Sequence, residues 1–178
     1  MMIWIDDLTF QRSCAYCLLM EVTVRGAKKN DLQAVLELYM QLHPGDLSFP
    51  FDRELKRIWS DISSSPVMHC YVAEKEGRVV ATGILAVLPN LTRGGRPYGL
   101  IENVVTDKRF RRSGIGRELL KHILLEAKHL RCYKVMVLTD VHREGIVEFY
   151  QAAGFKTGVK NGLVWYSHYV KSPNAGMV

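Results

Sequence analysis

A long amphipathic segment between two apolar runs restricts the fold of this chain more than any other feature. Residues 114–130 repeat apolar side chains at helical spacing and carry most of their charge elsewhere, which predicts a helix packed on a core. The apolar runs 98–106 before it and 133–138 after it have the length and composition of strands. Two strands joined through a helix lie parallel in one sheet, with a right-handed crossover.

The segments before this unit predict two early helices and an antiparallel meander. N-cap residues open each helix and breakers follow it, while a glycine-containing loop at 75–78 suits a hairpin. The remaining strands are expected at 21–25, 70–73, 79–88 and 163–170, and the remaining helices begin at Asn30-Asp31, at Asp52 and at about Gly145. The fold class is therefore α/β (α+β), with a central mixed, mostly antiparallel sheet flanked by helices.

The length of 178 residues fits one domain. Residues 1–19 lack a convincing period and precede a second methionine, Met20, so we expect an N-terminal extension or a misassigned start, a single domain at 20–170 and a tail at 171–178. No apolar stretch reaches the roughly 18–20 residues of a membrane-spanning helix, so no membrane partner is expected. The four cysteines are too scattered for a disulfide framework or a metal site, which predicts a cytoplasmic protein without a metal.

The net charge of +6 requires an explanation, because a basic surface attracts anions. Only residues 108–112, KRFRR, are densely basic. Nucleic acid, anionic lipid and phosphorylated small molecules are all possible partners of such a cluster. A small ligand with a phosphate fits one short cluster best, and nucleic acid is not expected, since only Phe110 lies nearby as an aromatic stacking platform.

The loop before the long helix has the properties of an anion site. Free backbone N–H groups at a helix start, the positive end of its dipole, glycines and neighbouring guanidinium groups all favour a phosphate. The spacing excludes a Walker loop, and Leu119 stands where a dinucleotide fingerprint needs its third glycine. Alternatively, the segment is a glycine turn with solvated arginines. The residues of the loop are Arg111, Arg112, Ser113, Gly114, Ile115 and Gly116, with Arg117 just beyond.

The order of strand, R-x-x-G-x-G and helix, together with the F-Y-x-x-x-G-F ending at 149–155, resembles the GNAT superfamily of N-acetyltransferases. The resemblance implies a sheet splayed between its fourth and fifth strands, with acetyl-CoA held in the opening. It also implies that the backbone of Asn103, Val104 and Val105 binds the pantetheine arm, that the amides from Arg111 to Gly116 with Arg117 bind the pyrophosphate, and that the protein is a homodimer.

Two residues are candidates for catalysis. Tyr150 matches the tyrosine that GNAT enzymes often place beside the sulfur, where a phenol can protonate or hydrogen-bond the thiolate. Glu102, a carboxylate among apolar neighbours of a strand, is a candidate base or ammonium anchor. The alternatives are a core tyrosine and a solvated glutamate at the edge of a strand.

Residues 101–105 and 132–135 are similar to glucosamine-6-phosphate N-acetyltransferases in particular. That similarity suggests an amino-sugar phosphate as acceptor, with Arg93 or Arg96 as phosphate ligands and Asp140 on the acceptor side. The chain departs from the pattern at Asn103, where the family has an aspartate, and at Arg143, where many GNAT enzymes have an asparagine.

The leading hypothesis is N-acetylation of a small-molecule primary amine by acetyl-CoA, through direct attack in a ternary complex. Protein or peptide N-acetylation is one alternative. A non-catalytic module that binds acyl-CoA or nucleic acid is the other, and it would show steeply salt-dependent binding without turnover.

Overall fold

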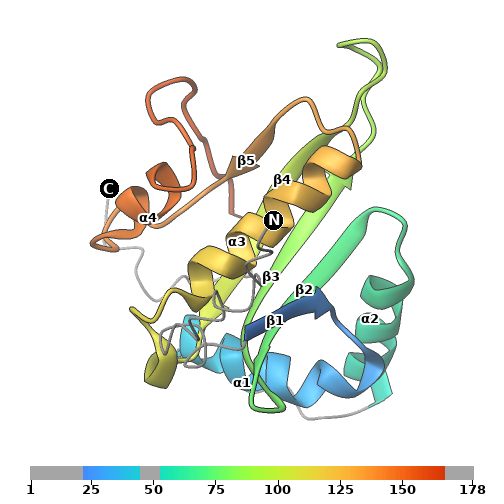
Figure 1. Cartoon of the computed structure of the whole chain (residues 1–178). Coiled ribbons are helices and arrows are strands. Elements are labelled where there is room, and N and C mark those ends of the chain that lie inside the picture. Colours follow the sequence, from blue (N-terminus) through green and yellow to red (C-terminus); the bar gives the residue numbers. More distant parts are fainter. Residues whose placement is uncertain (1–21, 45–52, 167–178) are drawn as a thin grey trace, which may run out of the picture.

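The computed structural model describes residues 22–44 and 53–166, which form a five-stranded sheet covered by helices on both faces (Figure 1). The strands are β1 Val22–Gly26, β2 Met68–Lys75, β3 Arg78–Leu88, β4 Tyr98–Thr106 and β5 Val135–Val137. The helices are α1 Leu32–Leu42, α2 Arg53–Ser64, α3 Ile115–His129 and α4 Ile146–Gln151, with short 3-10 turns η1 Lys29–Asp31 and η2 Lys108–Phe110.

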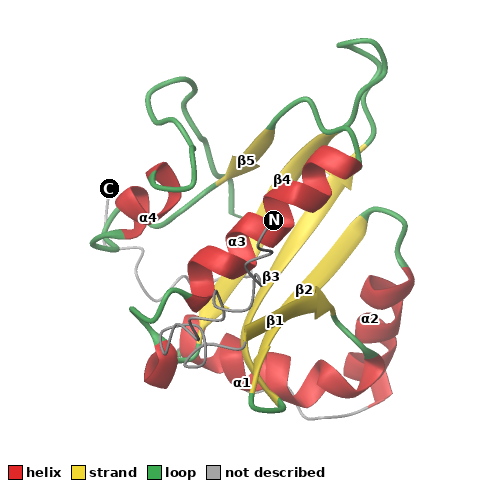
Figure 2. Cartoon of the chain, viewed as in Figure 1, coloured by secondary structure: helices red, strands yellow, loops and turns green. Residues whose placement is uncertain are grey.

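The sheet follows the order of the chain, β1-β2-β3-β4-β5, and only the pair β4 and β5 is parallel (Figure 2). The predicted mixed, mostly antiparallel sheet is confirmed. The hairpin between β2 and β3 turns through Glu76 and Gly77, both with positive φ, as a two-residue turn that matches strand twist requires.

Two apolar clusters hold the helices on opposite faces of the sheet. One packs α3 and α4 against the sheet around Leu85, Ile101 and Leu119. The other packs α1 and α2 against the opposite face around Val35, Trp59 and Ile84. The helix predicted at 114–130 is confirmed, since its apolar stripe is the buried face of α3.

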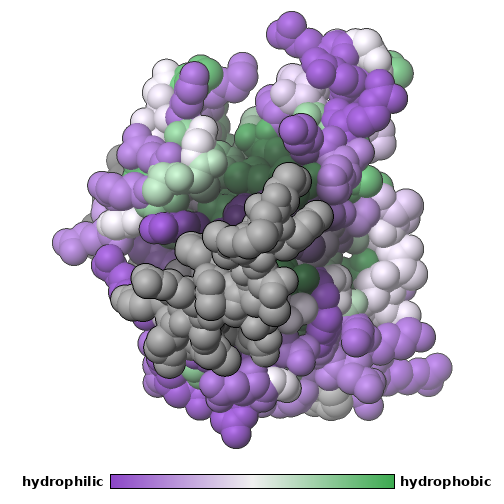
Figure 3. All heavy atoms as spheres, viewed as in Figure 1, coloured by the Kyte–Doolittle hydropathy of each residue, from purple (hydrophilic) through white to green (hydrophobic). Residues whose placement is uncertain are grey.

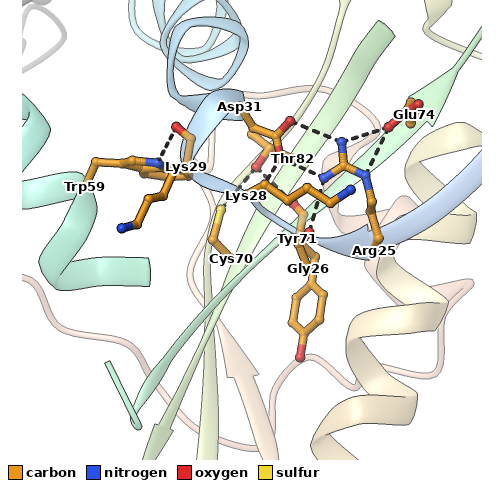
Figure 4. Close-up of polar contacts among 10 residues, drawn as sticks. All are labelled: Arg25, Gly26, Lys28, Lys29, Asp31, Trp59, Cys70, Tyr71, Glu74 and Thr82. Carbon is orange, nitrogen blue, oxygen red and sulfur yellow. Dashed lines mark hydrogen bonds and ion pairs between the residues drawn. The ribbon is translucent and has the colours of Figure 1, made fainter. Parts of the chain in front are cut away.

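Polar contacts fasten β1 and the start of α1 to the meander (Figure 4). Arg25 donates to Asp31 and to Glu74 of β2, each at 2.7 Å. The Asp31 carboxylate also accepts the Lys28 backbone N–H, so it closes η1 instead of capping α1 with its side chain, as the Asn30-Asp31 signal suggested. The guanidinium of Arg25 lowers the pKa of Asp31.

The last predicted strand is wrong for the residues that are described. Residues 163–166 form no strand, and Leu163 and Trp165 are 92% and 85% exposed. A segment with strand propensity forms a strand only where a neighbouring strand edge pairs with it. Strand β5 is also shorter than predicted, since it spans three residues instead of the expected 133–138. The extension 1–19, Asp52, the remainder of 163–170 and the tail 171–178 lie outside the described residues.

Candidate active site

The sheet opens where the pairing of β4 with β5 ends. The two strands are in register only from Gly99 opposite Val135 to Ile101 opposite Val137. Beyond Ile101, β4 continues to Thr106 without β5 beside it, and Leu138, the first residue after β5, is 54% exposed. The splay expected between the fourth and fifth strands is therefore present, and residues 102–105 border it.

The β4 side of this opening contains a bulge. Ile84 of β3 pairs with Glu102 and Thr82 pairs with Val105, so Gly83 alone faces both Asn103 and Val104. Asn103 has φ of +55°, a left-handed conformation that few residues other than glycine adopt. A bulge turns backbone groups out of the ladder, which affects Asn103 and Val104, both half-buried, whereas Val105 is 2% exposed and stays paired with Thr82.

The segment between β4 and α3, residues 107–114, contains most of the predicted anion site and is called the anion loop below. Asp107 opens it by accepting the backbone N–H of Arg109, and the Arg109 side chain helps to hold the pKa of Asp107 at about 2. Arg112 and Gly114 both have positive φ, and Gly114 is the N-cap of α3. The first turn of a fifteen-residue helix therefore presents its N–H groups beside the exposed Arg111 and Arg112.

Gly116 is required by close packing. A Cβ at this position would lie 3.0 Å from the Thr106 hydroxyl oxygen and 3.5 Å from the Phe149 ring. The start of α3 thus approaches both the end of β4 and helix α4. A larger residue here would push the anion loop away from the opening.

Tyr150 of α4 and Glu102 of β4 are the two catalytic candidates. Tyr150 is buried with its ring edge-on to those of Phe149 and Phe155. Burial is the main cause that raises the pKa of Tyr150 to about 12; the charge of Arg143 lowers it and that of Glu102 raises it. Burial also raises the pKa of the Glu102 carboxyl above its ordinary value.

A hollow of about 340 Å³ lies between α3 and α4, where apolar surface gathers in the space-filling view (Figure 3). Leu124, Leu125, Ala152 and Ala153 form its apolar lining, and Arg117 and Lys121 supply two cations. Sequence analysis did not single out Lys121. Its position four residues after Arg117, on the same side of α3, is the signal that would have found it.

Other predicted residues lie elsewhere. Arg93 and Arg96 belong to the exposed turn before β4, and Arg96 is six residues from Glu102, about 20 Å along an extended strand. Asp140 lies exposed in the segment after β5, where its carboxylate accepts the backbone N–H of His142 at 2.9 Å. Within residues 22–44 and 53–166, no three potential metal ligands gather, and no helix is long and apolar enough to cross a membrane.

Comparisons with known proteins show what this chain is similar to. A glucosamine 6-phosphate N-acetyltransferase of Trypanosoma brucei brucei is 33% identical over 90 residues, which cover 51% of the chain and 59% of that protein, less than two thirds of its length. The enzyme of the same name from Arabidopsis thaliana is 30% identical over 121 residues, covering 66% and 76%.

Among solved structures, a candidate acetyltransferase of Agrobacterium tumefaciens str. C58 superposes with a TM-score of 0.77 and 37% identity, covering 82% of this chain and 99% of the other. The Acetyltransferase (GNAT) family matches residues 32–155, from the start of α1 to the end of the F-Y-x-x-x-G-F motif. This chain therefore belongs to the GNAT family of acetyl-CoA-dependent acyltransferases.

Proposed function

We propose that the protein transfers the acetyl group of acetyl-CoA to the primary amine of a small molecule. The observation that carries the proposal is the opening between β4 and β5, which Glu102 of β4 borders and which lies beside the strand that leads into the loop before α3. The acting domain is proposed to be residues 20–170. We place it in the cytoplasm, where the free thiols of Cys70 and Cys132 stay reduced.

Acetyl-CoA binds as a substrate in this proposal. Its pyrophosphate lies against the amides from Arg111 to Gly116, where the dipole of α3 and the guanidinium groups favour negative charge. Arg117 and Lys121 bind phosphate at the hollow between α3 and α4. The backbone of Asn103, Val104 and Val105 binds the pantetheine arm, and the bulge supports this role because it frees polar groups from the ladder.

Acetyl transfer proceeds by direct attack. The amine nitrogen bonds to the carbonyl carbon, the carbon–sulfur bond breaks with its electron pair leaving on sulfur, and one proton moves from the amine to the thiolate. The thiols of Cys70 and Cys132 have pKa values raised by burial, so both stay protonated and neither suits a covalent nucleophile.

Tyr150 stabilises the leaving thiolate. With a pKa of about 12 the phenol keeps its proton throughout the neutral range. Outright transfer of that proton to a thiolate whose conjugate acid has a pKa near ~8.5 is uphill by roughly three units, so hydrogen-bond donation to the sulfur is the better role.

Glu102 accepts the proton of the incoming amine, directly or through water, or anchors its ammonium form. Its raised pKa makes the carboxylate a stronger base than an ordinary glutamate. The two roles differ in their consequences: loss of a base removes the acid limb of the pH profile, whereas loss of an anchor raises the KM for the amine. The variant Glu102→Gln separates them.

An amino-sugar phosphate is the acceptor class that we favour, because two relatives carry the name glucosamine 6-phosphate N-acetyltransferase. Asp140 is the proposed partner of its polar groups. Arg93 and Arg96 remain proposed phosphate ligands, and they lie in the exposed turn before β4. A homodimer is proposed from the resemblance to GNAT enzymes, which are commonly dimers.

The test is a thiol-release assay with acetyl-CoA and a panel of amines that includes glucosamine 6-phosphate, polyamines, amino acids and peptides. Tyr150→Phe should lower kcat about 100-fold with the preferred amine, the low end of what removal of one hydrogen-bond donor to a developing negative charge costs. Tyr71→Phe is the matched control, since Tyr71 is also buried and carries a pKa raised to about 12, yet belongs to β2, away from the opening.

Preference for peptides would favour protein acetylation. Acetyl-CoA binding without turnover would favour a sensing module, and no binding would overturn the proposal.

A further inference from the structure

The hollow between α3 and α4 has more room and more apolar surface than a phosphate group needs. Its volume of about 340 Å³ is that of a pocket for a small organic ligand. The greater part of its lining is apolar and comes from both helices: Leu124, Leu125, Ala152 and Ala153. A ligand that fills this space therefore carries an apolar group beside its negative charge.

The two cations of the hollow are free to contact a ligand. No ion pair joins Arg117 to any residue that the structure describes. The Lys121 ammonium lies 3.8 Å from the Glu118 carboxylate, and its side chain is 68% exposed. An exposed pair at this distance contributes little, so a phosphate can replace the carboxylate at small cost. Arg117 and Lys121 are one helical turn apart on the same side of α3.

The hollow continues the anion loop along α3. Gly114 is the N-cap of the helix, and Lys121 lies seven residues further, about 10 Å along its axis. From the loop onward, α3 therefore presents backbone N–H groups first, then the two cations, and then the apolar side chains of Leu124 and Leu125. One end of CoA has its groups in the same order, because a 3′-phosphate and then an adenine follow its diphosphate.

We propose that the hollow binds the adenosine 3′-phosphate end of the acetyl donor, and that Lys121 makes the enzyme prefer a donor with this phosphate. The proposal rests on the proposed function and adds a determinant of donor specificity to it. Arg117, in the first turn of α3, contacts the diphosphate as well, whereas Lys121 lies one turn further and contacts only the 3′-phosphate. The small side chains of Ala152 and Ala153 leave room for the base.

The first test compares the binding of CoA and 3′-dephospho-CoA by calorimetry. The wild-type protein should bind CoA about 10-fold more tightly, the low end for a hydrogen bond between charged groups, since Lys121 is exposed. Lys121→Met should reduce this ratio to about 2-fold by weakening CoA alone. Lys128→Met is the matched control, because it removes the same charge two turns further along α3, outside the hollow, and should leave the ratio unchanged.

The second test fills the apolar part of the hollow. Ala152→Leu should weaken CoA and 3′-dephospho-CoA equally, by about 10-fold, because it takes the place of the base that both ligands share. The affinity for 4′-phosphopantetheine, which has no nucleoside, should stay the same. Adenosine 3′,5′-bisphosphate should displace CoA from the wild-type protein and should compete less well for Ala152→Leu.

Equal binding of CoA and 3′-dephospho-CoA to the wild-type protein would overturn the proposal. An equal fall of the ratio in Lys121→Met and Lys128→Met would do so too, since the overall charge of α3 would then explain it. If Ala152→Leu weakens 4′-phosphopantetheine as much as CoA, the base does not occupy the hollow. A protein that prefers CoA as expected but acetylates no amine would refute the proposed function alone, whereas one that binds no CoA would refute both.

Discussion

The two edges of β4 differ in how completely they are paired. Toward β3, seven residue pairs run from Leu88 and Tyr98 to Ala81 and Thr106, with one bulge. Toward β5, three pairs hold and the rest of the edge is open. The same strand is thus part of a continuously paired meander on one side and borders the proposed binding opening on the other. A sheet admits a ligand between its strands only where it gives up backbone pairing, so the fully paired side must supply the stability.

Removal of core volume should affect the paired side most. Leu85 is fully buried on β3, and Leu85→Ala should lower the free energy of unfolding by about 3–4 kcal/mol. Val137→Ala on the half-buried β5 should lower it by roughly 1 kcal/mol. Urea denaturation followed by circular dichroism measures both. Equal losses would contradict the difference between the two sides.

The ion-pair network at β1 should contribute the next largest effect. Arg25→Met leaves the buried Asp31 carboxylate without its guanidinium partner, which should cost about 2 kcal/mol and raise the pKa of Asp31. Arg57→Met is the matched control, since it breaks an exposed pair with Asp61 on α2 and should cost less than about 0.5 kcal/mol. The same urea experiment compares them, and indistinguishable midpoints would show that the network adds nothing to the meander.

Acid should destabilise the fold through Asp107, which directly follows β4. Its pKa of about 2 lies below the unfolded value, so the ionised carboxylate stabilises the fold above about pH 4, and that stability is lost as the pH falls toward 2. After allowance for the exposed Arg109 partner, the loss is about 1–2 kcal/mol. Unfolding free energies at pH 5 and pH 2.5 measure it, and Asp107→Asn should show a smaller difference. If Asp107→Asn loses as much free energy of unfolding between the two pH values as the wild type, other carboxylates cause the acid sensitivity.

The smallest effect is expected at the exposed end of the described chain. Leu163 is 92% exposed, and Leu163→Ser should change the free energy of unfolding by less than about 0.5 kcal/mol. A loss above 1 kcal/mol that grows with protein concentration would show that this segment packs against a second copy. The open side of β4 would then be stabilised by association.

Local sequence signals predicted those elements whose stability is local. The stripe of α3, the glycine of the hairpin at Gly77 and the anion loop at Gly114 all depend on residues near one another in the chain. The short length of β5 and the bulge at Asn103 depend on which strand lies alongside, and periodicity carries no such information.

The order of strands in the sheet repeats their order in the chain, which bears on how the molecule is made. Strands β2, β3 and β4 follow one another without a helix between them, so these three strands can pair through short-range contacts as the chain emerges during synthesis, whereas β1 pairs with β2 across α1 and α2. The last strand must wait for α3 to cross over the sheet. Pulse-labelled hydrogen exchange during refolding should therefore protect amides of β2 and β3 before those of β5, and the reverse order would refute this sequence of events. The side of the sheet that is proposed to receive the acetyl donor is expected to pair after β2, β3 and β4 have joined.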